Sequence, residues 1–567
     1  MRICILLSVL LFMGHATFCQ NTYKMGITDN YLIKNALVVS KPGAAPVKQD
    51  ILIEDGIIKS VGPNQKLPLN TLDLSCDSMY IYAGFIAGAS YIGIKAPEEK
   101  KDAPKPPSRD EATYEQSGIT PQVSALSQLN ASDKSIEDFR KAGFTVAQVF
   151  PKGGMIPGQS SIISLKMAKD GDELVIADAK NLLSTFTSSR LVAPSTQIGV
   201  MARYRNLYKN AELADKNAMA YKTNPVGLKA PSFSEEIAAL IPFQKKERNV
   251  YFLAPKAKDI YRASALQKEL GYNLYLVDVK HIGDAMDLVK SAKLPVLLSI
   301  DLPEKEEEKG GKSEKGKKPD EKAAEKETKE SSPELDSLKA KKNAAIKAYE
   351  EEAGKLEKAG ISFTFSLLDA KATDISKTLM RMVDAGLSKD AALAALTTTP
   401  ASWLGLSKTH GTIEQGKVAN LVIMDKPIFE KEGKIKMVMI EGRLFDGLVA
   451  DKAPAEAGKG GSIEGSWTYV TVVQGGEEIG TFKFTKDGSS YKGVVISDRT
   501  SSAGSEIKDL VFKDNKLSGY TTVDADGTIK VDFNLTFDGS KFTGKVSVPG
   551  MGSFDISGSK KPDNNEF

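Results

Sequence analysis

The sequence predicts an α/β protein built around a distorted TIM-like (β/α)8 barrel, followed by an all-β domain. Apolar, β-prone runs alternate with helical stretches across residues 81–408, which is the pattern of a parallel sheet covered by helices. β-rich runs flank this region on both sides. After a linker rich in Ala, Gly and Pro at 452–461, the pattern becomes purely β. The 567 residues suffice for two or three domains, each with its own core.

The amino-terminal residues 1–19 have the pattern of a secretory signal peptide. Met1-Arg2 precedes a short apolar run and the small or weakly polar stretch 14–19. This run is too short to cross a bilayer, which takes about 20 residues. We expect cleavage after Cys19 and export to the periplasm. A lipoprotein anchored through Cys19 is the alternative, although Phe18 fits a lipid-attachment site poorly.

Two β-rich runs, 31–39 and 50–62, follow the signal segment, with Asp55-Gly56 as a hairpin turn. The barrel region then begins at residue 81. Its clearest strands are 144–150, 249–253, 273–279, 295–300 and 361–367, and its clearest helices are 135–142, 257–270 and 282–292.

Two segments interrupt the barrel pattern. Residues 95–109 are rich in proline and charge and are expected to form a loop over the barrel mouth. Residues 304–332 consist almost entirely of Lys, Glu, Gly and Ser, which predicts a disordered insertion. The same charge bias continues to residue 358 with Ala, Leu and Tyr added, which favours a solvated helix.

The carboxyl-terminal segment 462–562 predicts an antiparallel β domain. A polar turn followed by a strand and a glycine recurs three times, at 486–493, 513–519 and 538–544. Such repeats predict hairpins in an antiparallel sheet or a small barrel. Trp467, near the start of the first strand, is expected to fill the core of this domain.

Several spaced motifs resemble the amidohydrolase superfamily. Residues 81–94 read Ile-Tyr-Ala-Gly-Phe-Ile-Ala-Gly-Ala-Ser-Tyr-Ile-Gly-Ile. They resemble the first barrel strand of that family, Pro-Gly-Phe-Ile-Asp-x-His-x-His. Residues 153–160 resemble its glycine-rich loop, and 411–425 with 436–443 resemble its closing run. The resemblance extends over roughly residues 31–445.

This resemblance implies a composite β-sandwich formed by residues 20–80 and 409–451 around the barrel at 81–408. It also implies a metal site, which takes about four imidazoles and a carboxylate to hold one or two ions. Here the acidic position falls on Ala87 and the two histidine positions on Ala89 and Tyr91. The chain has three histidines in all, one of them in the signal segment, so these positions are vestigial.

Only two residues remain as candidates for catalysis. The resemblance places the histidine of the sixth strand near His281 and the aspartate of the eighth strand near Asp369. The position on the fifth strand falls near Ala254 or Pro255, where no imidazole is present. Structural or capping roles are favoured for both candidates. His410 is expected to lie outside the barrel mouth.

We therefore expect a pseudoenzyme that binds a small molecule or pairs with a competent relative or another copy of itself. No cofactor is expected. The alternative is an active hydrolase of carbon–nitrogen bonds, such as amides or cyclic amides, with zinc in a reduced site. A third possibility is an adhesion protein that binds through its carboxyl-terminal domain. The net charge of +3 gives no bias toward nucleic acid, and no later segment is apolar enough to span a membrane.

Overall fold

The structure is a computed structural model. It describes residues 30–96, 108, 111–168, 171–178, 181–187, 192–303, 333–446 and 463–560, except for residue 70 and short gaps at 474–475, 488–489, 498–503, 514, 525–527, 540 and 550–551. The predicted signal peptide, the insertion at 304–332, the linker at 452–461 and most of the loop at 95–109 lie outside the described residues. The chain divides into two compact units, Met1–Val449 and Ala450–Phe567.

The first sheet combines strands from both sides of the barrel region. Its strands are β1 (Asn30–Val38), β2 (Val47–Glu54), β3 (Ile57–Gly62), β4 (Thr71–Ser75), β5 (Tyr80–Ala83), β16 (Leu421–Met424), β17 (Ile435–Ile440) and β18 (Arg443–Asp446). They follow the order β18-β17-β16-β5-β1-β2-β3, with β4 beside β1. Antiparallel pairing of β16 with β5 joins the two flanks, as the resemblance implied.

The second sheet carries the predicted alternation of strands and helices. Its strands are β6 (Phe85–Ser90), β7 (Phe144–Val149), β8 (Gly158–Gln159), β9 (Ser161–Ser164), β10 (Val175–Ala177), β11 (Leu182–Ser184), β12 (Asn249–Leu253), β13 (Asn273–Val279), β14 (Val296–Ser299) and β15 (Phe363–Leu367). Parallel pairings run along β7-β6-β15-β14-β13-β12-β11. Strands β9 and β8, separated by Ser160 alone, pair antiparallel with β7 and β11 respectively. The curled sheet therefore departs from a regular (β/α)8 pattern at residues 158–164.

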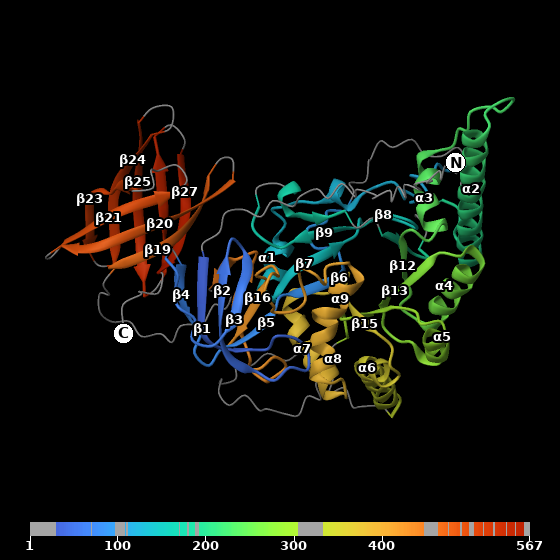
Figure 1. Cartoon of the computed structure of the whole chain (residues 1–567), viewed down its shortest axis with the longest axis horizontal. Helices are drawn as coiled ribbons and strands as arrows, with labels where there is room; N and C mark the ends of the chain where they lie inside the picture. The colour runs from blue at the N-terminus through green and yellow to red at the C-terminus, as the bar shows by residue number, and fades with distance from the viewer. Residues whose placement is uncertain are drawn as a thin grey trace, which may run out of the picture. The chain divides into compact units, whose positions relative to one another are not determined.

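Helices cover this sheet on its outer side (Figure 1). They are α1 (Lys134–Lys141), α2 (Gln197–Thr223), α3 (Glu235–Gln244), α4 (Ala257–Leu270), α5 (Met286–Ser291), α6 (Pro333–Lys358), α7 (Ile375–Asp384), α8 (Lys389–Leu396) and α9 (Thr398–Trp403). Helix α1 begins where the Asp133 carboxylate accepts a hydrogen bond from Ser135 N. Helix α4 ends at Gly271, whose φ of +82° favours glycine.

Two expectations about these helices need correction. The predicted helix 282–292 is divided into a 3-10 turn, Gly283–Ala285, and α5. Residues 333–358 do form a helix, α6, but it is not simply solvated. Ile346, Glu352 and Leu356 are each at most 2% exposed, because α6 packs on the first unit along one side. The charged composition of α6 gave no indication in the sequence that one face of the helix is buried.

A buried ion pair connects the second sheet to the first. Ser164 Oγ, at the end of β9, donates to Glu441 Oε1 at 2.5 Å, and Lys166 Nζ lies 3.1 Å from Glu441 Oε2. Glu441 lies in the turn between β17 and β18, and its backbone N donates to Asn420 Oδ1 at 2.7 Å. A charge buried this deeply requires such partners, so these contacts fix the two sheets to each other.

The second unit is an antiparallel meander in which the first strand pairs with the last. Its strands are β19 (Gly465–Val473), β20 (Gly476–Asp487), β21 (Ser490–Ser497), β22 (Ser505–Glu506), β23 (Lys508–Lys513), β24 (Lys516–Asp524), β25 (Thr528–Asp538), β26 (Lys541–Val548) and β27 (Gly552–Lys560). The predicted all-β domain is thus confirmed. Trp467 is fully buried, donates from Nε1 to Ile463 O at 2.8 Å, and packs edge-on against Phe537. As expected, it fills the core.

The two tryptophans of the chain allow the stability of the second unit to be measured separately, because Trp403 and Trp467 lie in different units. In a Trp403→Phe background, Phe542→Ala is expected to lower the free energy of unfolding by about 3–5 kcal/mol, since Phe542 is 1% exposed and packs against Trp467. Urea titration followed by Trp467 fluorescence measures this. Val511→Ala, at a residue 58% exposed, serves as the control and should change the value by less than about 0.5 kcal/mol.

Candidate functional site

The positions where the family carries its first metal ligands are filled by packing residues. Ala87 and Ala89 on β6 are 1% and 0% exposed. Ala87 belongs to the large core that includes the covering helices, whereas Ala89 packs with aromatic and aliphatic residues of the sheet interior. Tyr91, just after β6, is half-buried and contacts both groups. Methyl groups occupy two of the three positions and a phenol occupies the third.

A row of small and polar side chains runs across neighbouring strands at the level of Ala89. Ser366 on β15 is the register partner of Ala89, and Ser299 on β14 is the register partner of Ser366. Asp278 on β13 completes the row. It has a φ of +54° and lies where the register with β14 shifts between Leu276 and Val279. This irregularity changes the direction of the Asp278 side chain within an otherwise apolar strand.

The polar atoms of this row are buried and poorly satisfied. Asp278, Ser299 and Ser366 are 4%, 2% and 1% exposed. Asp278 Oδ1 and the two hydroxyls make no hydrogen bond of ordinary length and angle among the described residues, although both hydroxyls lie close enough to lower the pKa of the carboxyl. Burial outweighs this effect and, with the Asp369 charge, raises the pKa of Asp278. Buried polar atoms of this kind commonly mark a site for water or a ligand.

Charged residues surround this row at the carboxyl ends of the strands. Lys280 Nζ lies 3.1 Å from Asp301 Oδ2. Burial lowers the pKa of Lys280, but the hydrogen bond to Asp301 and the charges of Asp278, Asp301 and Asp369 together raise it. Burial also raises the pKa of Tyr91, and the charges of Asp369 and Asp278 add to the rise. Lys280 is therefore a stable ammonium ion at neutral pH, and Tyr91 a neutral phenol.

The predicted candidates His281 and Asp369 have different surroundings. Asp369 is exposed after β15 and acts electrostatically on Tyr91, Asp278 and Lys280. His281 instead faces α6, where its Nδ1 lies 3.2 Å from Glu352 Oε2, and its ring packs edge-on against Tyr349. Glu352 Oε1 also accepts from Ile282 N at 3.0 Å. No hydrogen bond or ion pair joins His281 to Asp369 in the described part of the chain.

His410 lies in the sandwich region, beside Lys417. Its Nδ1 is 2.8 Å from Thr409 Oγ1, and the residue is 8% exposed. Burial and the Lys417 charge lower the pKa of His410 to about 4. Its location agrees with the expectation that it lies away from the barrel mouth, and its imidazole is neutral at pH 7.

The donors at the mouth do not fit the metal site that the family implies. Among the described residues, no group of three or more His, Cys, Asp or Glu side chains is arranged to hold a metal ion. The carboxylates nearest the vestigial positions, Asp278 and Asp369, act on the ammonium of Lys280. A divalent ion there would meet a like charge instead of imidazole nitrogens.

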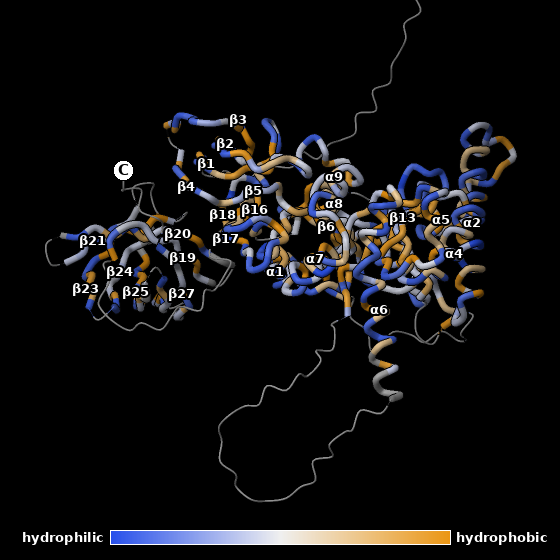
Figure 2. The backbone as a smooth tube through the Cα atoms, turned by 90° about the horizontal axis from the view of Figure 1, so that it is seen from below, coloured by the Kyte–Doolittle hydropathy of each residue, from blue (hydrophilic) through white to orange (hydrophobic). Residues whose placement is uncertain are grey.

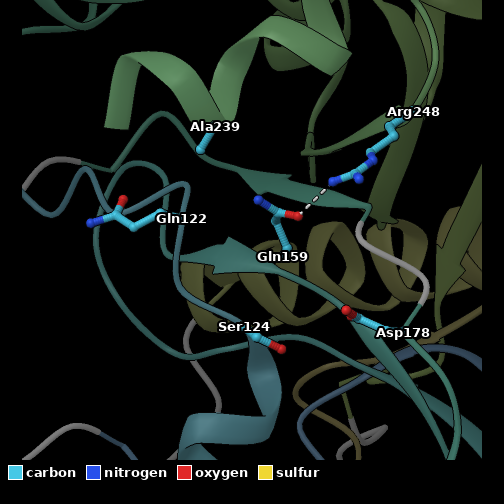
Figure 3. A pocket seen from close by; sticks show the side chains of 6 residues that line it. All are labelled: Gln122, Ser124, Gln159, Asp178, Ala239 and Arg248. Atoms are coloured by element: carbon cyan, nitrogen blue, oxygen red, sulfur yellow. Dashed lines mark hydrogen bonds between the residues drawn. The ribbon is translucent and has the colours of Figure 1, made fainter. Parts of the chain in front are cut away.

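A separate pocket lies at the opposite ends of the strands. It has a volume of about 330 Å³ and is lined by Gln122, Ser124, Gln159, Asp178, Ala239 and Arg248 (Figure 3). Arg248 precedes β12 and donates to Gln159 Oε1 at 3.0 Å, and Gln159 is level with Leu182, the first residue of β11. This pocket therefore opens at the amino ends, while barrel proteins conduct their chemistry at the carboxyl ends.

Sequence reasoning missed Asp278, Ser299 and Ser366, and it placed Lys280 beside His281 at the end of the sixth strand without giving it a role. The signal that could have revealed Asp278 is a carboxylate inside the apolar run Leu-Tyr-Leu-Val-Asp-Val, residues 274–279. A charged residue within a buried strand requires a partner or a function. The two serines carried no such signal, because small hydroxyl residues are common in buried strands.

Comparisons with known proteins agree with this architecture. A family model described as "Amidohydrolase family" matches residues 328–445. The solved structure of an amidohydrolase from Thermotoga maritima MSB8 is 22% identical, covers 73% of this chain and all of its own, and gives a TM-score of 0.55. The chain thus shares the fold of this amidohydrolase, and residues 328–445 resemble the amidohydrolase family in sequence. No curated protein matches it.

Two further solved structures are more distant. One is a Xaa-Pro dipeptidase with methionine bound in its active site, 15% identical, covering 74% of this chain and 100% of its own, with a TM-score of 0.44. The other is a prolidase in complex with N-methylphosphonate-L-proline, 15% identical, covering 74% and 99%, with a TM-score of 0.43.

The lowered pKa of His410 predicts a pH dependence of stability. In the unfolded chain a histidine titrates near pH 6.5, so between about pH 6.5 and pH 4 the unfolded state binds the proton and the folded state does not. Stability contributed by His410 is therefore present above this window and is lost as the pH falls through it. When the pH is lowered from 7 to about 4.5, the free energy of unfolding should fall by roughly 2 kcal/mol less in His410→Gln than in the wild type.

Urea titration at both pH values, followed by Trp403 fluorescence in a Trp467→Phe background, measures this difference. Comparing the drop within each protein cancels any loss of packing caused by the substitution itself. An identical fall in the free energy of unfolding in the two proteins would contradict the lowered pKa of His410.

Proposed function

We propose that this protein is an exported amidohydrolase-fold protein that has lost metal-dependent hydrolysis and binds a small ligand at the carboxyl ends of its barrel strands. The observation that carries the proposal is the ammonium of Lys280 among Asp278, Asp301 and Asp369. These carboxylates already have an internal counter-ion where relatives of this fold use metal ions.

The residues around Lys280 support loss of the metal on chemical grounds. Two of the three vestigial positions are alanines, which provide no donor atom. The third, Tyr91, keeps its phenol protonated because its pKa is raised, and metals bind the deprotonated form. His281 hydrogen-bonds to Glu352, which supports a structural role for its imidazole.

The same residues support binding. The hydroxyls of Ser299 and Ser366 and the Asp278 carboxylate offer buried hydrogen-bonding atoms that lack well-formed partners. Burying such atoms without partners costs about 1–3 kcal/mol each, so a ligand or water that satisfies them would be stabilised. Lys280 and Asp369 next to them would select a polar ligand over an apolar one.

One prediction of this proposal concerns the metal content of the purified protein. Protein purified without chelators and analysed by inductively coupled plasma mass spectrometry should contain zinc, iron and manganese well below one ion per chain, because imidazole donors are lacking. The Thermotoga maritima amidohydrolase, prepared in the same way, is the comparison. A full equivalent of any of these metals would overturn the proposal.

A second prediction tests Lys280 directly. Replacing Lys280 with Gln removes the internal cation while keeping a hydrogen-bonding side chain, so the remaining carboxylates should attract a divalent ion more strongly. Isothermal titration with Mn²⁺ should show tighter binding to Lys280→Gln than to the wild type. Lys268→Gln, on the exposed face of α4, is the matched control and should behave as the wild type. Equal weak binding by all three proteins would show that Lys280 does not replace a metal.

The alternative is an active hydrolase of carbon–nitrogen bonds with a reduced site that uses Asp369 and His281. The match of residues 328–445 to the amidohydrolase family model and the fold shared with the Thermotoga maritima amidohydrolase are the observations in its favour. It requires activity on amides or cyclic amides that is abolished both by a chelator and by His281→Ala. We expect no chelator-sensitive turnover, and its detection would establish the alternative.

A further inference from the structure

The helical hairpin formed by α2 and α3 extends beyond the core of the first unit. The buried residues of α2 all lie in its first five turns and end at Ala214, and they include Tyr204 and Tyr208. Residues 216–223 and the connection to α3 at 224–234 form a tip that projects past the neighbouring elements (Figure 1). We call residues 216–234 the arm tip.

The arm tip exposes large apolar side chains. Met219, Val226, Leu228 and Phe233 are 58%, 83%, 50% and 39% exposed. In Figure 2 the tube beside the α2 label, where the connection to α3 runs, has both hydrophobic (orange) and hydrophilic (blue) stretches. Single exposed apolar residues are ordinary, but several at one projecting end indicate a surface that contacts something apolar.

The charge of the arm tip has one sign. Residues 216–234 contain Lys216, Lys222 and Lys229 and no aspartate or glutamate; Asp215 just before them pairs with Lys245, and Glu235 and Glu236 follow them at the start of α3. Lys222 and Lys229 are exposed, and Lys216 pairs with Glu212 on the preceding turn. Apolar side chains interspersed with lysines on a projecting end are typical of segments that enter the headgroup region of an anionic membrane.

We propose that the arm tip docks on the surface of an anionic lipid bilayer, with its apolar side chains in the headgroup region and its lysines beside lipid phosphates. None of the described helices is long and apolar enough to span a membrane, so this contact is peripheral. A second copy docking tip to tip is disfavoured, because two lysine-bearing tips repel each other. A protein partner would need to bury about 800 Å² on each side, which favours a flatter surface than a projecting hairpin end.

The test is cosedimentation of the full mature chain with large vesicles. Vesicles of phosphatidylcholine with one quarter phosphatidylglycerol should bind the protein, and pure phosphatidylcholine vesicles should bind it much more weakly. Val226→Ser/Leu228→Ser and Lys222→Glu/Lys229→Glu should each weaken binding about tenfold or more, because each removes one of the two attractions. Raising the salt concentration should weaken wild-type binding.

Leu69→Ser is the matched control, since Leu69 is 93% exposed and lies far from the arm tip in the sequence. It should bind as the wild type does. Circular dichroism confirms that each variant is folded. Absence of binding to the anionic vesicles, or equal binding by both arm-tip variants and the wild type, would overturn the proposal. Sedimentation velocity that shows self-association abolished by Val226→Ser/Leu228→Ser would assign the arm tip to a second copy instead.

Discussion

The charge balance at the carboxyl ends of the barrel strands is the constraint on which the interpretation of this molecule depends. A cluster of partly buried carboxylates needs positive charge nearby, and the sequence resemblance implied that metal ions would supply it. Here the ammonium of Lys280 lies 3.1 Å from Asp301 and is stabilised by Asp278 and Asp369 as well. A side-chain cation cannot polarise a substrate or activate water as a divalent ion does. It can still orient a polar ligand, which is why we favour binding over hydrolysis.

The backbone makes this arrangement possible. In a regular strand the side chain of Asp278 would follow the alternation of the neighbouring residues. The positive φ of Asp278 and the register shift beside it instead bring its carboxyl to the level of Ser299 and Ser366. Such irregularities cost free energy and persist where the surroundings determine them, which is common at functional sites. Ala89, the register partner of Ser366, is fully buried among apolar side chains at a position where the resemblance implied a histidine.

Long-range contacts hold the two sheets of the first unit together around this site. Pairing of β16 with β5 joins segments more than 300 residues apart, and the buried contacts of Glu441 with Ser164 and Lys166 hold the sandwich to the barrel sheet. His281 also has a part in this scaffold, because Glu352 on α6 bonds to both its ring and the following backbone nitrogen. His281, a candidate for catalysis by the family resemblance, thus helps to hold α6 in place. The charged composition of α6 had suggested a solvated helix.

The sequence by itself predicted the order of strands and helices and the all-β unit with Trp467 in its core, because both follow from local periodicity. Its resemblance to the amidohydrolase superfamily predicted the joining of the two flanks, and the residues at 87, 89 and 91 are read from the sequence as Ala, Ala and Tyr. Only the tertiary structure decided which polar groups share the barrel mouth. Asp278 and Lys280 come from the end of β13, Ser299 from β14 and Ser366 from β15, and a bulge and the strand register, which local sequence does not specify, bring them together. The tertiary structure also decided that His281 faces α6 and does not contact Asp369, because the direction of a side chain after a strand depends on what packs against it.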